Sequence, residues 1–266
     1  MLAACVLCLA LLGCSYFWDD ESPEYVEKPV EDLYNTAMDS LLVSDYDESA
    51  RLFDEVERQH PYSVWASKAQ LMAAYAYYQN NAYDEAIVAL DRFIQLHPGN
   101  RDVSYAYYLR AICFYEQISD VKRDQKMTEE ALAALQEVVR RFPDSRYARD
   151  ATLKMDLARD HLAGKHMSIG RFYQEQSEYL AAINRFRIVI EEYQTTTHVP
   201  EALHRLVESY LAIGVIDEAQ ATAAVLGYNF PGSDWYADSY MLLTGIDRRP
   251  EQSQGSWISR VWKSII

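Results

Sequence analysis

A spacing that recurs five times is the feature that most constrains the fold of this chain. In each copy, apolar residues stand four and seven positions after a small residue, and a proline usually stands twelve positions after it. The small residues that open the five copies are Ser49, Ala86, Ala131, Ala182 and Ala219. Positions separated by four and seven lie on one face of a helix, and proline ends a helix because it lacks the N–H group. Each copy therefore predicts a helix with a small contact point, an apolar face and a defined end.

A second helix is expected before each of these helices. Counting back twelve residues from the small residue reaches another small residue in three copies, at Ala37, Ala74 and Gly170. In the third copy the matching small residue is Ala111, provided that the residues SDVKRDQK are an insertion. The fourth copy departs from the spacing at its end, where Gln194 stands in place of the proline. Two small residues that face each other let the helices of a pair approach closely.

The whole pattern is helical from Val30 to about Leu243 and resembles the tetratricopeptide repeat. Each helix pair leaves an apolar face that only a neighbouring pair can cover, so repeats of this kind stack in a row. We therefore expect an all-α fold, a right-handed superhelical solenoid of five tetratricopeptide-like helix pairs. A generic helical bundle is the alternative.

The amino terminus predicts secretion and lipidation. Residues 1–14 carry no charge and are shorter than the roughly 20 apolar residues that span a bilayer. The run suits a secretory signal, and its end, LLGC, resembles the lipobox of bacterial lipoproteins. This resemblance implies a signal peptide over 1–13, a lipid on Cys14 as the membrane anchor, and an acidic tether over 14–30. No basic residue precedes the apolar run, so either the signal is atypical or the true start of the chain lies upstream of Met1. The alternative to a signal peptide is that the run begins a buried helix.

The charge, the cysteines and the motifs of the chain argue against several classes of function. The formal net charge is −15, whereas nucleic-acid binding needs clustered Lys and Arg, so no nucleic-acid partner is expected. Once Cys14 is acylated, Cys113 stands alone and no intramolecular disulfide can form. The chain after Cys14 has no phosphate loop, nucleophile elbow or metal-ligand spacing. We expect no enzymatic activity and no cofactor apart from the lipid.

Tyrosine is the most informative residue type, with 21 in the chain. In tetratricopeptide-like folds the first helix of each pair lines the concave face. Projecting the repeat spacing onto these helices predicts an aromatic groove within residues 31–145. Its expected lining residues are Tyr34, Leu71, Tyr75, Tyr78, Tyr105, Tyr108 and Tyr115. Tyr offers a large apolar area and a polar tip, which suits a peptide-binding surface. Packing of some rings in the core between repeats is the alternative.

Three longer stretches, residues 60–98, 140–151 and 162–186, resemble the BamD family of outer-membrane lipoproteins. That family belongs to the β-barrel assembly machine of Gram-negative bacteria. The resemblance implies a scaffold at the periplasmic face of the outer membrane whose first repeats bind targeting peptides of unfolded outer-membrane proteins. It also implies that the carboxy-terminal repeats dock the last POTRA domain of BamA, and it leaves room for other Bam lipoproteins as partners.

The resemblance also points to docking residues in the half formed by residues 146–243. An Asn-Arg pair in the fourth repeat of the family contacts BamA, and the matching pair here is Asn184-Arg185. Arg171 projects from the first helix of the same repeat and joins the predicted docking set. A surface arginine that only supports its own helix is the alternative for Arg185.

The last segment, residues 244–266, joins a Gly/Ser-containing linker to WISRVWKSII. Helical spacing puts Trp257 and Trp262 on one side, with Arg260 and Lys263 away from it. This segment is interpreted either as a contact with membrane or partner, or as a helix that folds back on the last repeat. Two rival functions are an adaptor for cell-wall hydrolases and a superhelical lytic transglycosylase. The second would need a separate catalytic domain, for which no stretch is left.

Overall fold

The computed structural model describes residues 27–245, and every regular element in that range is an α helix. The helices are α2 (Val30–Leu42), α3 (Tyr46–Gln59), α4 (Ala66–Gln79), α5 (Tyr83–Leu96), α6 (Val103–Glu116), α7 (Lys126–Arg141), α8 (Arg146–Glu175), α9 (Tyr179–Glu192), α10 (Val199–Ala212), α11 (Ile216–Asn229) and α12 (Asp234–Thr244).

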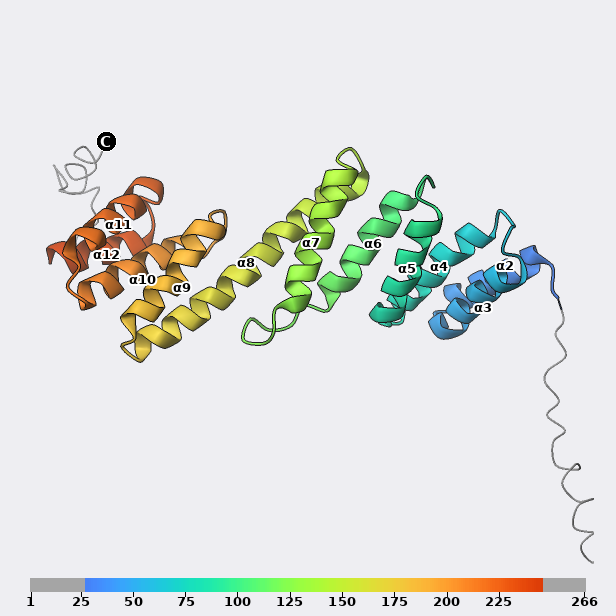
Figure 1. Ribbon diagram of the computed structural model, residues 1–266, viewed down its shortest axis with the longest axis horizontal. Coiled ribbons are helices and arrows are strands. Elements are labelled where there is room, and N and C mark those ends of the chain that lie inside the picture. The colour runs from blue at the N-terminus through green and yellow to red at the C-terminus, as the bar shows by residue number, and fades with distance from the viewer. Residues whose placement is uncertain (1–26, 246–266) are drawn as a thin grey trace, which may run out of the picture.

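Consecutive helices pair as antiparallel neighbours and stack in chain order along one long axis (Figure 1). The five pairs are α2–α3, α4–α5, α6–α7, α8–α9 and α10–α11, and α12 packs against the last of them. The predicted all-α solenoid of five helix pairs is confirmed by this arrangement.

The predicted small residues lie at close contacts between the helices of the first and fourth pairs. The Ser49 hydroxyl donates to the Ala37 carbonyl at 2.9 Å, which joins α3 to α2 across the spacing of twelve. In the fourth pair, the ring of Phe186 lies so close to Gly170 that a Cβ there would approach it to 2.5 Å. Small side chains at these positions therefore set how closely the two helices approach.

The turn inside a pair needs an unusual backbone conformation. In four of the five pairs, the turn contains a residue with positive φ, which favours Gly or Asn. These residues are Ser44, Asn81, Ser177 and Gly214. The third pair has instead the longer connection 117–125, which contains the predicted insertion except for Lys126, the first residue of α7.

The second helices end two residues before the predicted prolines, because the residue before a proline avoids the helical region. The fourth repeat behaves in the same way without a proline, since α9 ends at Glu192, two residues before Gln194. A proline at this position is therefore not required for the helix to end.

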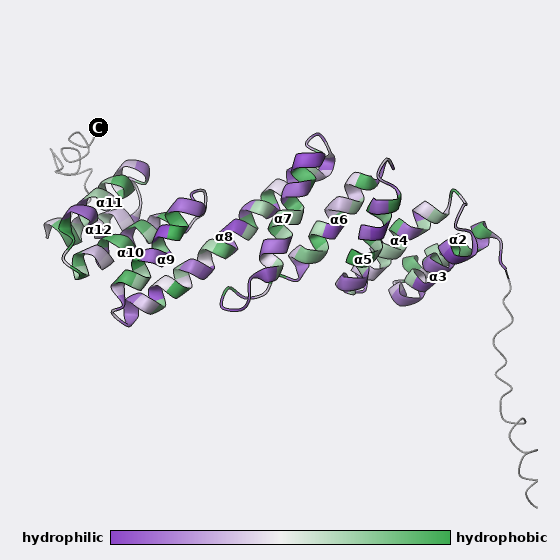
Figure 2. Cartoon of the chain, viewed as in Figure 1, coloured by the Kyte–Doolittle hydropathy of each residue, from purple (hydrophilic) through white to green (hydrophobic). Residues whose placement is uncertain are grey.

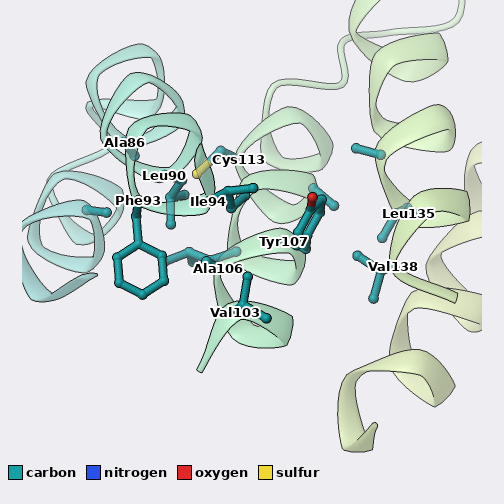
Figure 3. Close-up of a cluster of buried hydrophobic side chains, with 14 of the residues drawn as sticks. Ala86, Leu90, Phe93, Ile94, Val103, Ala106, Tyr107, Cys113, Leu135 and Val138 are labelled. Carbon is teal, nitrogen blue, oxygen red and sulfur yellow. The ribbon is translucent and has the colours of Figure 1, made fainter. Parts of the chain in front are cut away.

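Hydrophobic side chains between the pairs form two large buried clusters. The first extends from Leu71 on α4 to Met155 on α8, and Figure 3 shows its centre, where α5, α6 and α7 meet. The second extends from Ala163 on α8 to Tyr240 on α12. Figure 2 shows the resulting mixture of hydrophilic and hydrophobic residues along the helices.

Helix α8 is longer than the repeat spacing predicts. It has 30 residues, whereas the neighbouring helices of the pairs have 13 to 16. Its first half packs in the first cluster through Ala151 and Met155, and its second half packs in the second cluster through Ala163 and Met167. The two halves of the solenoid thus share one continuous helix.

The predictions for the ends of the chain lie outside the described residues. They concern the signal peptide, the lipid on Cys14, most of the tether, and Trp257 and Trp262. Within residues 27–245, no helix combines the length and apolar character needed to cross a membrane.

Replacement of Gly170 by Ala tests the close contact in the fourth pair. The added Cβ would collide with the ring of Phe186, so we expect Gly170→Ala to lower the free energy of unfolding by about 1–3 kcal/mol. Urea denaturation measures the effect. Gly99→Ala is the matched control, because a Cβ at Gly99 meets no atom within 4 Å. Equal stability of the two variants would contradict this account of the packing.

Candidate functional site

Seven tyrosines from four helices pack together on the surface of the first hydrophobic cluster. They are Tyr75, Tyr78, Tyr83, Tyr105, Tyr108, Tyr115 and Tyr147, and we call them the tyrosine cluster. All seven are half-buried, so each ring contacts the core on one side and solvent on the other. Five of the seven were predicted from the repeat spacing.

Ring contacts join six of these seven tyrosines into two groups of three. Tyr78 lies between Tyr75 and Tyr83, with ring centroids 6.5 and 6.0 Å away. Tyr147, at the start of α8, contacts both Tyr105 and Tyr108, at 5.6 and 5.0 Å. Aromatic pairs at these distances add to the stability gained from burial alone. Contacts with neighbouring rings and with the first hydrophobic cluster therefore hold these rings in place.

A carboxylate and an amine lie at the edge of the cluster. The Tyr108 hydroxyl donates to Asp150 at 2.5 Å, and the Lys154 amine lies 3.4 Å from the same carboxylate and above the ring of Tyr115. Burial raises the pKa of Tyr105, and burial together with the hydrogen bond to Asp150 raises the pKa of Tyr108. Both phenols therefore stay protonated and can donate hydrogen bonds at any physiological pH.

Two predicted groove residues lie elsewhere. Leu71 is buried in the first hydrophobic cluster, because it lies one turn before Ala74, on the helix face that contacts neighbouring helices. Tyr34 belongs to a separate cluster at the amino-terminal end, where its ring lies 5.3 Å from Phe53 and 4.8 Å from Trp65. The prediction that Leu71 lines the groove is therefore wrong, since this residue lies in the core. Tyr34 lies in a different hydrophobic cluster from the other predicted rings.

Arg185 lies in a hollow where the long connection 117–125 folds over α8. The hollow has a volume of about 460 Å³ and includes four basic side chains, those of Lys122, Arg123, Lys165 and Arg185, against the carboxylates of Asp124 and Glu129. We call it the basic hollow. The connection is held in place by hydrogen bonds from α8, since the imidazole of His161 lies 2.7 Å from the Ser119 carbonyl and Lys165 donates to the Arg123 carbonyl.

His166 lines the same hollow. Burial and the nearby Arg185 lower the pKa of its imidazole, so the ring is neutral at pH 7. Its Nδ1 atom is buried and has no hydrogen-bond partner within residues 27–245. None of the four basic side chains forms an ion pair in that range. The hollow thus keeps cationic groups available to an anionic partner.

Arg171 is not part of the basic hollow. Its guanidinium donates to Glu201 on α10 at 2.9 Å, and it lines a different hollow together with Gln174, Arg205 and Glu208. Asn184 is exposed on α9. The predicted docking set is therefore divided between two surfaces, because Arg171 projects toward α10 whereas Arg185 lies beside the connection 117–125.

Sequence reasoning missed Tyr83 and Tyr147 as members of the tyrosine cluster. Tyr83 lies on a second helix, whereas the spacing was projected onto the first helices, and Tyr147 precedes the part of α8 that follows that spacing. It also missed the hollow of about 760 Å³ between α3 and α5, where Tyr77 donates to Asp54 at 2.6 Å. No group of His, Cys, Asp and Glu side chains in residues 27–245 is arranged as a metal site.

Comparisons with known proteins agree on one family. A family model described as YfiO, outer membrane lipoprotein, matches residues 26–226. The outer membrane protein assembly factor BamD of Caulobacter vibrioides is 53% identical over 249 residues, 94% of this chain and 82% of that protein. The factor of the same name from Rickettsia prowazekii is 44% identical over 241 residues, 91% and 95% of the two chains. Among solved structures, a tetratricopeptide-repeat protein of Thermus thermophilus is 19% identical, with a TM-score of 0.38 over 80% of this chain and all of that one.

The hollow around Arg171 predicts a dependence of stability on pH. Burial acts to raise the pKa of Glu208, but hydrogen bonds with His204 and Arg205 outweigh it and hold the pKa at about 2. A carboxylate with a depressed pKa stabilises the fold above its unfolded pKa, near 4.3, and this contribution is lost as the pH falls toward 2. We expect Glu208→Gln to remove about 1–2 kcal/mol of the stability difference between pH 6 and pH 2.5.

Urea denaturation across this pH range measures the dependence. Glu178→Gln is the matched control, because Glu178 is exposed in the turn between α8 and α9. If the Glu208 variant kept the full pH dependence of the unchanged protein, the proposed role of the hydrogen bonds would be wrong.

Proposed function

Because the chain belongs to the BamD family of outer membrane protein assembly factors, we propose that it is a non-enzymatic scaffold. It binds an extended peptide of an unfolded outer-membrane protein on the tyrosine cluster, and it docks BamA through the basic hollow. The observation that carries this proposal is the tyrosine cluster itself, in which five half-buried rings come from the first helices of the second and third repeats and Tyr83 and Tyr147 come from α5 and α8.

The chemistry of the cluster suits a peptide that is not yet folded. Such a peptide exposes backbone N–H and C=O groups together with apolar and aromatic side chains. The tyrosine rings offer apolar area at a small cost in side-chain entropy, and their hydroxyls exchange hydrogen bonds with the peptide backbone. Asp150 and Lys154 at the edge of the cluster add one charge of each sign, which favours a defined direction of the bound chain.

The basic hollow suits an acidic partner. Four cationic side chains face two carboxylates, and Arg185 is half-buried within this group. A carboxylate from a POTRA domain of BamA would replace water around these groups and gain charge-assisted hydrogen bonds. The connection 117–125 extends this contact surface from the fourth repeat to the third.

Function follows from holding two partners at once. A peptide on the tyrosine cluster and BamA at the basic hollow are bound to one chain, so each encounters the other at a raised effective concentration. The lipid proposed for Cys14 keeps this encounter at the membrane, where the product must be inserted. Two or more acyl chains on that cysteine hold a protein stably, whereas one chain holds it only marginally.

Removal of two rings tests peptide binding. We expect Tyr78→Ser combined with Tyr147→Ser to weaken the binding of a labelled carboxy-terminal peptide from an outer-membrane β-barrel by about tenfold or more, because aromatic anchors carry most of such an affinity. Fluorescence anisotropy measures the dissociation constant. Tyr62→Ser is the control, since Tyr62 is fully exposed in the α3–α4 connection. Unchanged affinity in the double variant, with the fold intact by circular dichroism, would exclude the tyrosine cluster as the peptide site.

Charge reversal tests the docking surface. We expect Arg185→Glu to abolish recovery of BamA in an affinity pull-down from extracted membranes, because it places a carboxylate in the basic hollow. Arg187→Glu on the same helix is the control, since Arg187 is exposed and pairs only with Glu191 among the described residues. Loss of BamA with Arg171→Glu but not with Arg185→Glu would move the dock to the other hollow. Recovery of cell-wall hydrolases without BamA would favour the adaptor function instead.

A further inference from the structure

The carboxy-terminal end of the solenoid differs from the rest in its charge. The second helices of the first four pairs carry charged side chains beyond their first turn, whereas α11 has Asp217 and Glu218 in its first turn and none after them. Between Leu206 and Gly245 the sequence has five carboxylates and no Lys, Arg or His. Beyond α10 this end of the solenoid is therefore acidic, and the basic groups packed against it are His204 and Arg205 of α10, which both contact Trp235 on α12.

The same end presents apolar side chains to solvent. Met241 and Leu242 on α12 are 42% and 49% exposed, and Val225 on α11 is 37% exposed. On the opposite side of α12, Leu243 packs against the small cluster formed by α10 and α11. Helix α12 is thus fixed by one face and offers its other face, which is apolar and bordered by carboxylates, to a further element.

The sequence that follows α12 has the complementary composition. Residues 252–266 contain two basic side chains, Arg260 and Lys263, and no acidic one. Helical spacing in this segment groups Trp257 and Trp262 with three aliphatic residues on one side. The apolar side of this segment suits the apolar face of α12, and the net positive charge of residues 252–266 is opposite in sign to the carboxylates of that end.

The connection is long enough for this segment to reach the face. Residues 245–256 separate the end of α12 from Trp257, and twelve residues span at most about 43 Å. Helix α12 itself, with 11 residues, is about 16 Å long. Every point on the outer face of α11 and α12 is therefore within reach, and a short tether gives the segment a high effective concentration there.

We propose that residues 257–266 of this chain bind the outer face of α11 and α12 and close the carboxy-terminal end of the solenoid. The apolar side of the segment covers Met241 and Leu242, and its two basic residues lie on the side away from them. A solenoid needs a terminal element with a polar outer face, whereas α12 still exposes Met241 and Leu242. The site is formed by the chain itself and is separate from both the tyrosine cluster and the basic hollow.

Hydrogen exchange of the full chain in detergent tests the proposal. We expect amides of residues 219–244 to exchange at least about fivefold faster in the double variant Trp257→Ser/Trp262→Ser than in the unchanged chain. The double variant Met241→Ser/Leu242→Ser, which alters the receiving face, should show the same loss of protection in α11. Gln252→Ala/Gln254→Ala in the connecting segment is the matched control and should exchange like the unchanged chain. Unaltered exchange in α4–α7 reports that each variant is folded.

Three results would overturn the proposal. Equal exchange of residues 219–244 in the unchanged chain and the tryptophan variant would show that the segment does not cover this face. Equal exchange together with weaker co-sedimentation with phosphatidylethanolamine–phosphatidylglycerol vesicles would assign the segment to the membrane. Protection that increases with protein concentration would assign the face to a second copy of the chain.

Discussion

The close approach of two helices at a pair of small residues is the contact on which the rest of this structure depends. Where Ser49 meets Ala37, and where Phe186 covers Gly170, the helix axes come near enough for the larger side chains to reach the next pair. Those side chains then form the two buried clusters that join the pairs. A bulky residue at one such point would alter a pair and also the contacts of that pair with both neighbours.

In this stacked arrangement, the two helices of a pair present different kinds of side chain to solvent. The second helices present mixed charges to solvent, as with the pairs that Arg51 and Arg58 form with Glu48 and Glu55 on α3. The first helices of the second and third pairs present tyrosine rings. A binding surface can therefore be built from residues far apart in the sequence without any loop to hold it, and its stability comes from the same core that holds the pairs.

The sequence predicted the helix pairs well, because their contacts are local and repeat at a fixed interval. The sequence predicted the members of the tyrosine cluster less completely. Leu71 lies one turn before a contact residue and so turns inward, and Tyr147 joins the cluster only because α8 begins beside α6. Arg171 and Arg185 are fourteen residues apart in the sequence, yet they face different hollows. Which face a side chain occupies depends on the rotation of each helix in its pair, and spacing alone does not give that rotation.

Helix α8 has a mechanical consequence for a protein that binds two partners. Its 30 residues extend about 45 Å and contribute to both buried clusters. The helix therefore fixes the distance between the two halves of the solenoid. Hydrogen bonds along a continuous helix resist bending and stretching far more than a loop does. A displacement of the carboxy-terminal half therefore reaches the amino-terminal half through a continuous helix and not through a loop.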